Sequence, residues 1–367
     1  MRVSHNYLRQ QFDDVTINAI LVDLRQLARS GDFTMGQPLN DFERRFSATF
    51  VQGRPVVAVN SGTEALILAL KALGIGPGDE VIVPCNTFYA SAGAIVAAGA
   101  TPVFVDVDAT YSLRADMAST LVTARTRAIL AVWWGGMPPD FDAMRGPVWG
   151  LFAHIEDACQ GIGGSFDGTP AGCFGDAAAV SFHPIKTLHG WGDGGAVICD
   201  VDRAQWLRRY RDHGKVSRDE IAMWGVNAKL PTMQAVVLLH VMDAVKAATK
   251  RRQEIADRLD AGLRDVPGII VPPRDPRRQS SWRLYIVQCE ERDRLKDHLG
   301  RAGVEALIHY PTPLHLQAPG RALGYGPGDF PVAEAQAKRI VTLPCHEYLG
   351  DDDVDYVIES VGGFYGA

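Results

Sequence analysis

The sequence predicts an α/β protein with a mostly parallel, seven-stranded sheet in a large first domain, followed by a smaller C-terminal α+β domain. Three features predict this class. Short β-rich runs alternate with alanine-rich helical stretches up to about residue 200, a pattern typical of parallel strands joined by crossover helices. Long helical stretches come next. Two further β-rich segments, again separated by a helical one, then follow.

The large domain is expected to begin with an amphipathic helix over residues 12–29, which ends at Ser30-Gly31. The strands start at Val56, and helical stretches such as TEALILALKAL and SAGAIVAAGA separate several of them. The expected strands cover residues 56–59, 79–84, 102–107, 127–134, 152–157, 177–182 and 195–200.

The C-terminal part is expected to start inside a long connecting helix. Helical stretches cover roughly 202–211 and 231–263, and the domain boundary is placed near 245–265, which gives domains of residues 1–250 and 251–367. Two strands, WRLYIVQCE and VEALIHYP, and two helices, RDRLKDHLGRAG and DDDVDYVIESVGGF, make up the small domain.

Composition and charge exclude several classes of protein. A net charge of -6 gives no electrostatic reason to bind nucleic acid or an anionic membrane. The longest apolar run, near AVVLLHV, is far shorter than the ~20 residues of a membrane helix. The six cysteines are scattered without a CxxC pair, which favours buried thiols over a metal site. We therefore expect a soluble, cytoplasmic protein without a bound metal.

Residues able to bind an anion follow the first expected strand. The sequence Asn60-Ser61-Gly62-Thr63 opens a helix, and a helix start offers free backbone N–H groups and hydroxyls. A simple N-cap is the alternative. Phe88, after the second strand, places an aromatic ring at the same edge of the sheet, where it could equally be a core residue.

A carboxylate and a lysine follow two later strands. Glu156 and Asp157 end the fifth strand and must point to opposite faces; Asp157, spaced to converge with Gln160, is the one expected to face the site. Ser181 ends the sixth strand, and Lys186 follows it in a proline-restricted turn. A solvated acidic turn and a surface lysine are the alternatives for each taken alone.

Together these groups match the needs of one cofactor, pyridoxal 5′-phosphate. Its phosphate requires N–H and hydroxyl donors, and its ring can stack on an aromatic side chain. Its pyridine nitrogen needs an acid to stay protonated, and its aldehyde needs a lysine for a Schiff base. Because all four groups come from different strand ends at one sheet edge, the sequence predicts a pyridoxal-phosphate enzyme.

The sequence also resembles the sugar aminotransferases of the DegT/DnrJ/EryC1/StrS family, which have the fold-type I architecture of aspartate aminotransferase. The resemblance covers nearly the whole chain. It rests on SGDFTMGQPLNDFERRF, VNSGTEALILALKALGIGPGDEVIVPCNTFYAS, IEDACQGIGG, CFGDAAAVSFHPIKTLHGWGDGGAV, GVNAKLPTMQA and HYPTPLHLQ.

This resemblance implies a role for each candidate residue. Lys186 would form the Schiff base and move the catalytic proton, and Asp157 would pair with the pyridine nitrogen. Gln160 would bond the phenolic oxygen of the cofactor, and Phe88 would stack on its ring. The phosphate would be bound by Gly62, Thr63 and Ser181, and by Asn227 of the neighbouring subunit, so that a homodimer would share its active sites.

The substrate-facing residues depart more from the family pattern. His183 stands where tyrosine is common, Asn86 where histidine is frequent, and Lys229 where arginine is frequent. Candidate substrate contacts are His183, Trp191, Tyr310 and His315, each of which could equally be structural.

The resemblance implies an aminotransferase that converts a keto sugar, expected to be a nucleotide-linked deoxyhexose, to an amino sugar with L-glutamate as donor. Three alternatives stay open: an aminotransferase acting on an aminocyclitol ketone, a pyridoxal-phosphate-dependent sugar dehydratase, and a cofactor-binding regulator without turnover. In some dehydratases of the family histidine replaces the lysine, so Lys186 argues against that alternative.

Overall fold

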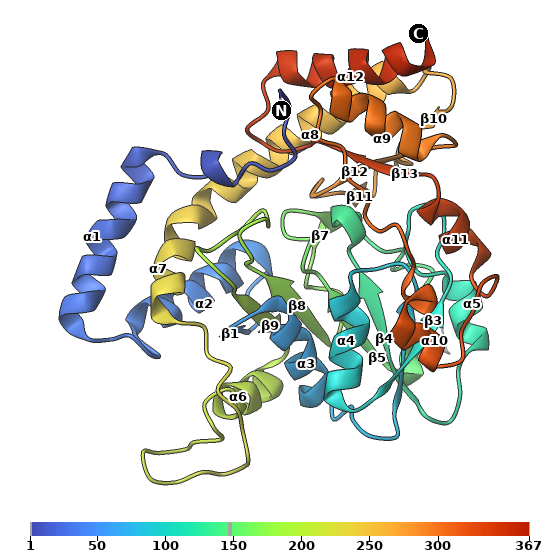
Figure 1. Cartoon of the computed structure of the whole chain (residues 1–367). Coiled ribbons are helices and arrows are strands. Elements are labelled where there is room, and N and C mark those ends of the chain that lie inside the picture. The colour runs from blue at the N-terminus through green and yellow to red at the C-terminus, as the bar shows by residue number, and fades with distance from the viewer. Residues whose placement is uncertain (1, 146–148, 367) are drawn as a thin grey trace.

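A seven-stranded sheet forms the centre of the protein (Figure 1). The computed structural model describes residues 2–145 and 149–366. The strand order is β1-β9-β8-β5-β4-β2-β3; β9 runs antiparallel to both neighbours, and the other adjacent pairs are parallel. All seven expected strands are present, and the predicted mostly parallel sheet is confirmed. They are β1 (Val56–Val59), β2 (Glu80–Pro84), β3 (Thr101–Val105), β4 (Thr126–Val132), β5 (Ala153–Asp157), β8 (Ala177–Ser181) and β9 (Gly195–Ile198).

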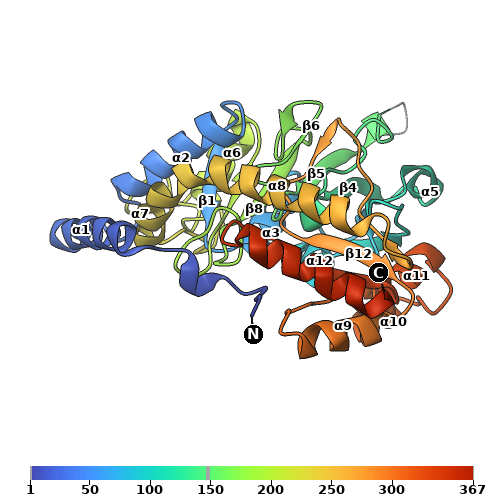
Figure 2. The same cartoon turned by 90° about the horizontal axis from the view of Figure 1, so that it is seen from above.

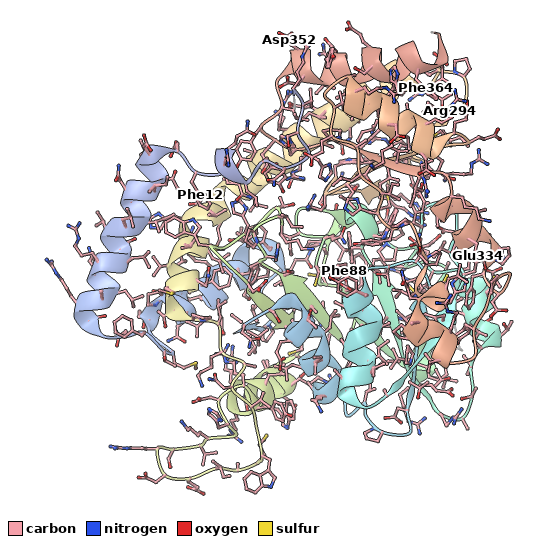
Figure 3. The ribbon with its side chains drawn as sticks, viewed as in Figure 1. Phe12, Phe88, Arg294, Glu334, Asp352 and Phe364 are labelled. Carbon is pink, nitrogen blue, oxygen red and sulfur yellow. The ribbon has the colours of Figure 1, made fainter. Side chains whose placement is uncertain are left out.

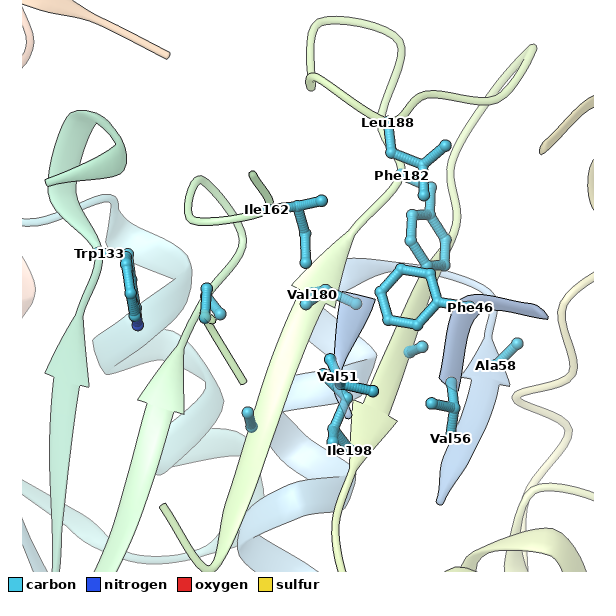
Figure 4. Packing of buried hydrophobic residues seen from close by; sticks show 14 of the residues in the cluster. Phe46, Val51, Val56, Ala58, Trp133, Ile162, Val180, Phe182, Leu188 and Ile198 are labelled. Atoms are coloured by element: carbon cyan, nitrogen blue, oxygen red, sulfur yellow. The ribbon is translucent and has the colours of Figure 1, made fainter. Parts of the chain in front are cut away.

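Helices cover both faces of this sheet because its strands are apolar on both sides. Alternate residues of β1 belong to different hydrophobic clusters: Val56 and Ala58 pack with Phe42 and Phe46 of α2, whereas Val57 packs on the other face. Figure 4 shows the first cluster, in which Phe46, Val180 and Phe182 lie together. The flanking helices are α1 (Asp14–Ser30), α2 (Gln37–Phe50) and α7 (Thr232–Val241) on one side, and α3 (Gly62–Ala72), α4 (Tyr89–Ala98) and α6 (Val201–Tyr210) on the other.

Two helix boundaries follow directly from sequence signals. Asp13 caps α1 by accepting a hydrogen bond from the backbone N–H of Thr16 at 2.7 Å, and Gly31 ends that helix with a φ of 79°. Ser61 caps α3 in the same way, accepting from the N–H of Glu64 at 3.1 Å. The first helix and its end at Gly31 are therefore as predicted.

A second, antiparallel sheet organises the C-terminal part, with the order β10-β12-β13. Its strands pack against α8, α9 and α12 around a separate hydrophobic cluster that also contains Val3. Figures 1 and 2 agree that α8 and α12 lie side by side. The elements are α8 (Val245–Leu263), β10 (Ile269–Ile270), β12 (Tyr285–Cys289), α9 (Arg292–Arg301), β13 (Ile340–Leu343) and α12 (Asp351–Tyr365).

Shorter elements connect these two parts. A small sheet in the order β11-β6-β7 joins the loop after α8 to the large domain. Within residues 2–145 and 149–366, no helix is both long and apolar enough to cross a membrane. The remaining elements are α5 (Ala115–Thr120), β6 (Ser165–Phe166), β7 (Thr169–Pro170), β11 (Arg278–Gln279), α10 (Ala318–Ala322), α11 (Pro331–Ala337) and the 3-10 helices η1 (Leu8–Gln10), η2 (Trp134–Gly136), η3 (Trp149–Leu151), η4 (Met242–Ala244) and η5 (Leu314–Leu316).

Two expectations for the second half of the chain are wrong. The segment 304–311 was expected to be a strand, but it forms only isolated bridges, because the place beside β12 is taken by β13. Leu307 still exchanges two backbone hydrogen bonds with Thr342, at 3.0 and 2.8 Å. The stretch 231–263 is not one helix either, since η4 separates α7 from α8.

Candidate active site

The largest cavity described lies at the carboxyl ends of the parallel strands and has a volume of about 470 Å³. Its position agrees with the rule that ligands of open α/β sheets bind beyond the strand ends. Phe88, labelled in Figure 3, lies on this cavity at the start of α4. The structure brings nine of the twelve candidate residues together on its wall: Gly62, Thr63, Phe88, Asp157, Gln160, Ser181, His183, Lys186 and Tyr310.

Asp157 ends β5 and turns its carboxylate into the cavity. One oxygen accepts a hydrogen bond from Ser91 Oγ at 2.6 Å, and the other accepts from the backbone N–H of Cys159 at 3.2 Å. A buried carboxylate held by two donors has a fixed direction. Asp157 is therefore set to face a cationic group in the cavity.

The neighbouring Glu156 points the other way, as successive strand residues must. Its two oxygens accept from Trp133 Nε1 and from the backbone N–H groups of Gly172, Phe174 and Gly175, at 2.7–2.9 Å. Burial raises the pKa of Glu156, and these hydrogen bonds oppose the rise. Glu156 fastens the loop after β7 and does not line the cavity.

The start of α3 meets the end of β8 in a tight cradle. A methyl group on Gly62 would lie 2.6 Å from Ser181 Cβ and 3.2 Å from Cys159 Sγ, so only glycine allows this approach. Ser61 is the N-cap of α3, which was the alternative role for this motif. It nevertheless lines the cavity together with Gly62 and Thr63. Free N–H groups and hydroxyls thus meet at one point, which suits a phosphate.

Lys186 lies in the loop after β8, and its half-buried side chain borders the cavity. Burial lowers the pKa of this lysine, and the nearby Arg283 lowers it further, against the opposing influence of Cys159 and Asp157. The N-terminal segment holds the loop from outside: Tyr7 Oη donates to the carbonyl oxygen of Ile185 at 2.8 Å. The lysine is therefore positioned and biased toward its neutral, nucleophilic form.

Gln160 and Tyr310 lie on the opposite wall. Gln160 Oε1 accepts from the backbone N–H of Gly135 at 3.0 Å, which leaves its amide NH2 as the donor available to a ligand. The rings of Tyr310 and Phe88 have centroids 6.0 Å apart. Burial raises the pKa of Tyr310 to about 12, so its hydroxyl stays protonated at neutral pH.

Three candidate residues do not line this cavity in the described chain. Trp191 is 41% exposed and touches Phe12 edge-on, with ring centroids 5.6 Å apart. His315 is fully buried, and its Nε2 lies 3.1 Å from an oxygen of Glu334. Asn227 is exposed and lies in the segment between α6 and α7. Figure 1 shows that this segment projects from the rest of the protein.

Three further residues at or behind the cavity wall are not indicated by the sequence patterns: Ser91, Arg283 and His309. Ser91 is fully buried in the first turn of α4, and a serine there, following a strand end, could have been recognised as a possible partner of the acid. Arg283 and His309 come from the C-terminal part of the chain, and no local pattern links them to the strand ends. Only the packing of the two parts brings them in.

The residues present fit pyridoxal 5′-phosphate. The glycine cradle suits the phosphate, Asp157 suits a protonated ring nitrogen, and Lys186 on the cavity wall suits an aldehyde. No group of three or more metal-binding side chains occurs among the described residues.

Comparison with known proteins decides the family. The family model "DegT/DnrJ/EryC1/StrS aminotransferase family" matches residues 15–362. The chain belongs to this family. The predicted family, fold type and cofactor are thereby confirmed: this aminotransferase has the fold-type I architecture and uses pyridoxal 5′-phosphate.

Curated relatives and solved structures are similar to this aminotransferase over almost their whole length. The erythromycin biosynthesis sensory transduction protein EryC1 of Saccharopolyspora erythraea is 40% identical, over 92% of this chain and 93% of its own. The dTDP-3-amino-3,4,6-trideoxy-alpha-D-glucose transaminase of Streptomyces venezuelae is 38% identical, over 90% and 88%. The crystal structure of S. venezuelae DesV in complex with a ketimine intermediate has a TM-score of 0.92 and 35% identity, and the match covers 100% of this chain and 98% of that one.

Proposed function

We propose that this aminotransferase converts a nucleotide-linked keto sugar, of the deoxyhexose type, to the amino sugar, with L-glutamate as the amino donor. The observation that carries the proposal is the meeting of Lys186, Asp157 and the Gly62–Ser181 cradle on one cavity. The relative from S. venezuelae, named as a transaminase of a dTDP-linked trideoxyglucose, supports the substrate class.

The bound cofactor supplies an electron sink for the carbon that carries the reacting nitrogen. The protein does the rest. Asp157, oriented by Ser91, would stabilise the proton on the ring nitrogen through a charge-assisted hydrogen bond. Gln160 would donate its NH2 to the phenolic oxygen, and the start of α3 with Ser181 would bind the phosphate.

Lys186 then acts as the acid–base group. With the cofactor bound, its neutral Nζ would accept the proton from the substrate carbon and would return it to the former aldehyde carbon on the other side of the reacting nitrogen. Burial lowers the pKa of Lys186, which favours the neutral amine that this role requires. The sugar ketone follows the same route in reverse, so the kinetics are expected to be ping-pong.

The test is a single-turnover experiment with the cofactor-loaded protein. L-glutamate alone should release one equivalent of 2-oxoglutarate and remove the absorbance of the lysine-bound aldehyde. A dTDP-linked 3- or 4-keto deoxyhexose should then be aminated, as measured by mass spectrometry. Lys186→Ala is the control and should do neither. Unchanged absorbance with every amino acid tested would contradict the proposal.

We further propose that two copies share their active sites, with Asn227 reaching the phosphate of the partner's cofactor. The projecting loop supports this, because Asn227 and Trp224 are exposed there and Trp224 is 88% exposed. Mixing Asn227→Asp with Lys186→Ala subunits should restore part of the activity, because one site of each heterodimer is then intact. No recovery despite proven subunit exchange would overturn the sharing.

Two smaller proposals complete the assignment. The domain boundary is proposed within α8, which gives residues 1–250 and 251–367; Ile255 and later residues of α8 already pack into the C-terminal cluster. Residues 1 and 367 themselves lie outside the described chain. A cytoplasmic location is proposed from the six free cysteines, which suit a reducing compartment.

A further inference from the structure

Arg283 is a buried cation on the cavity wall, and no side chain described in the structure pairs with it. Its side chain lines the cavity although the residue is only 6% exposed. Within residues 2–145 and 149–366 it forms no ion pair and no side-chain hydrogen bond, and its Nε is fully enclosed. By contrast, the equally buried Arg211 and Arg252 are paired with Glu43 and Glu347. A buried, unpaired guanidinium is costly, which points to a ligand that neutralises it.

The backbone around Arg283 is fastened to the same wall as Gln160. Ser281 Oγ donates to the carbonyl oxygen of Gln160 at 2.7 Å, and the N–H of Leu284 donates to the carbonyl oxygen of Gly135 at 3.0 Å. Gly135 in turn donates to the side chain of Gln160. Arg283 is thus fixed beside Gln160, on the cavity that Lys186 also lines, so it would lie near the aldehyde of a cofactor bound to that lysine.

Neighbouring groups do not neutralise Arg283. Asp157 accepts hydrogen bonds from Ser91 and Cys159, and Asp193 is exposed at the edge of the cavity. Glu347, the carboxylate whose charge acts on Arg283, is already paired with Arg252 at 2.6 Å. The imidazole of His309 is neutral at pH 7, because burial, helped by Arg283, lowers its pKa to about 4. Arg283 therefore remains a positive charge beside the reacting amine of Lys186.

We propose that Arg283 binds the α-carboxylate of the amino-acid donor. This inference rests on the proposed function and adds a recognition residue to it. In an α-amino acid the carboxylate is bonded to the same carbon as the amine, so it must lie close to the reacting atoms. The diphosphate of a nucleotide sugar is several bonds from the ketone and belongs nearer the cavity mouth. The planar guanidinium also suits a carboxylate, which it can bind with two parallel hydrogen bonds.

A consequence is that Arg283 acts mainly in one half of the reaction. The keto sugar has no carboxylate beside its ketone, so it gains nothing from Arg283. Removing the side chain should therefore weaken the donor and leave the acceptor nearly unaffected.

The test compares wild type with Arg283→Met, both loaded with cofactor. Calorimetry with 2-oxoglutarate measures binding without turnover, since both partners are in the keto or aldehyde form. We expect affinity for 2-oxoglutarate to fall about 10- to 150-fold, as for loss of a charged hydrogen-bonding partner. Affinity for dTDP should stay within about threefold, and so should amination of the sugar by protein preloaded with the amine form of the cofactor.

The matched control is Arg278→Met, since Arg278 has a 6% exposed side chain but is paired with Asp140 at 2.8 Å outside the cavity. That variant should bind 2-oxoglutarate like wild type and be less stable, whereas Arg283→Met should be as stable as wild type or more so. Should Arg283→Met not fold, Arg283→Lys is used instead, with a several-fold loss expected.

Three results have distinct meanings. Equal binding of 2-oxoglutarate by wild type and the Arg283 variant would overturn the assignment. Weaker dTDP binding with unchanged 2-oxoglutarate binding would also overturn the assignment, and would show that Arg283 binds the diphosphate of the nucleotide sugar. A wild type that releases no 2-oxoglutarate from L-glutamate would instead refute the proposed donor itself.

Discussion

Replacing Gly62 with alanine tests the phosphate cradle most directly. The added methyl group would lie 2.6 Å from Ser181 Cβ and 3.0 Å from Ser181 Oγ. Carbon atoms in contact normally lie about 3.5–4.0 Å apart, so the start of α3 or the end of β8 must move by roughly 1 Å. Neither element can move alone, because β8 is hydrogen-bonded to β5 and β9.

Two effects of different size follow from this shift. Overpacking of this kind costs about 1–3 kcal/mol of the free energy of unfolding. A 1 Å displacement also breaks at least one hydrogen bond between the helix start and the phosphate, which is worth about 1.5–3 kcal/mol. Gly62→Ala should therefore weaken cofactor binding by about 10- to 150-fold.

The assay combines urea unfolding of the cofactor-free protein with absorbance titration of pyridoxal 5′-phosphate. Gly93→Ala is the matched control: Gly93 also lies in a helix, but nothing lies within 4 Å of its added methyl, so that variant should be unchanged or slightly more stable. Gly62→Ala/Ser181→Gly should regain stability but not cofactor affinity. If Gly62→Ala binds cofactor as wild type does, the cradle is not where the phosphate lies.

Three further predictions concern buried polar groups. Ser91→Ala removes a 2.6 Å hydrogen bond to Asp157 and should lower the free energy of unfolding by about 1.5–3 kcal/mol, measured in urea; an unchanged value would mean that Asp157 finds another donor. Glu156→Gln should lower the free energy of unfolding by a similar amount, because an amide NH2 would face donors that now bind a carboxylate. Cofactor affinity should stay unchanged, since Glu156 does not line the cavity. A loss of affinity would contradict the separate roles of Glu156 and Asp157. The pKa of His346 is lowered to about 4, mainly by burial, so the unfolded state binds more protons between pH 6.5 and 4 and stability falls as the pH drops through that window. His346→Asn should reduce this slope by up to about 1.4 kcal/mol per pH unit in urea titrations, and an identical slope would refute the assignment.

The seven strands and the first helix of the large domain agree with the prediction because their signals are local. Apolar runs of strand length, separated by capped, alanine-rich helices, allow one arrangement in which every strand is buried on both faces. The strand expected at 304–311 is absent for a non-local reason. That segment and β13 are both short and apolar, and only tertiary pairing decides which of them becomes the strand beside β12.

The residues of the candidate site were likewise predictable only in part from the sequence. Sequence alone determined that Lys186, Asp157, Gln160 and Ser181 meet, because the carboxyl ends of neighbouring parallel strands lie at one sheet edge whatever the rest of the chain does. It could not separate Tyr310, on the cavity wall, from His315, which is buried against Glu334. Both stand in one short irregular segment without periodicity.

The sequence alone does not predict that Arg283 lines the cavity. Its place opposite Lys186 depends on how residues 281–284 pack against Gly135 and Gln160, which are more than a hundred positions earlier in the chain. The sequence thus determined which strand ends meet at the cavity, because strand ends converge by topology. Tertiary packing alone decided which charge from the C-terminal part lines the same cavity.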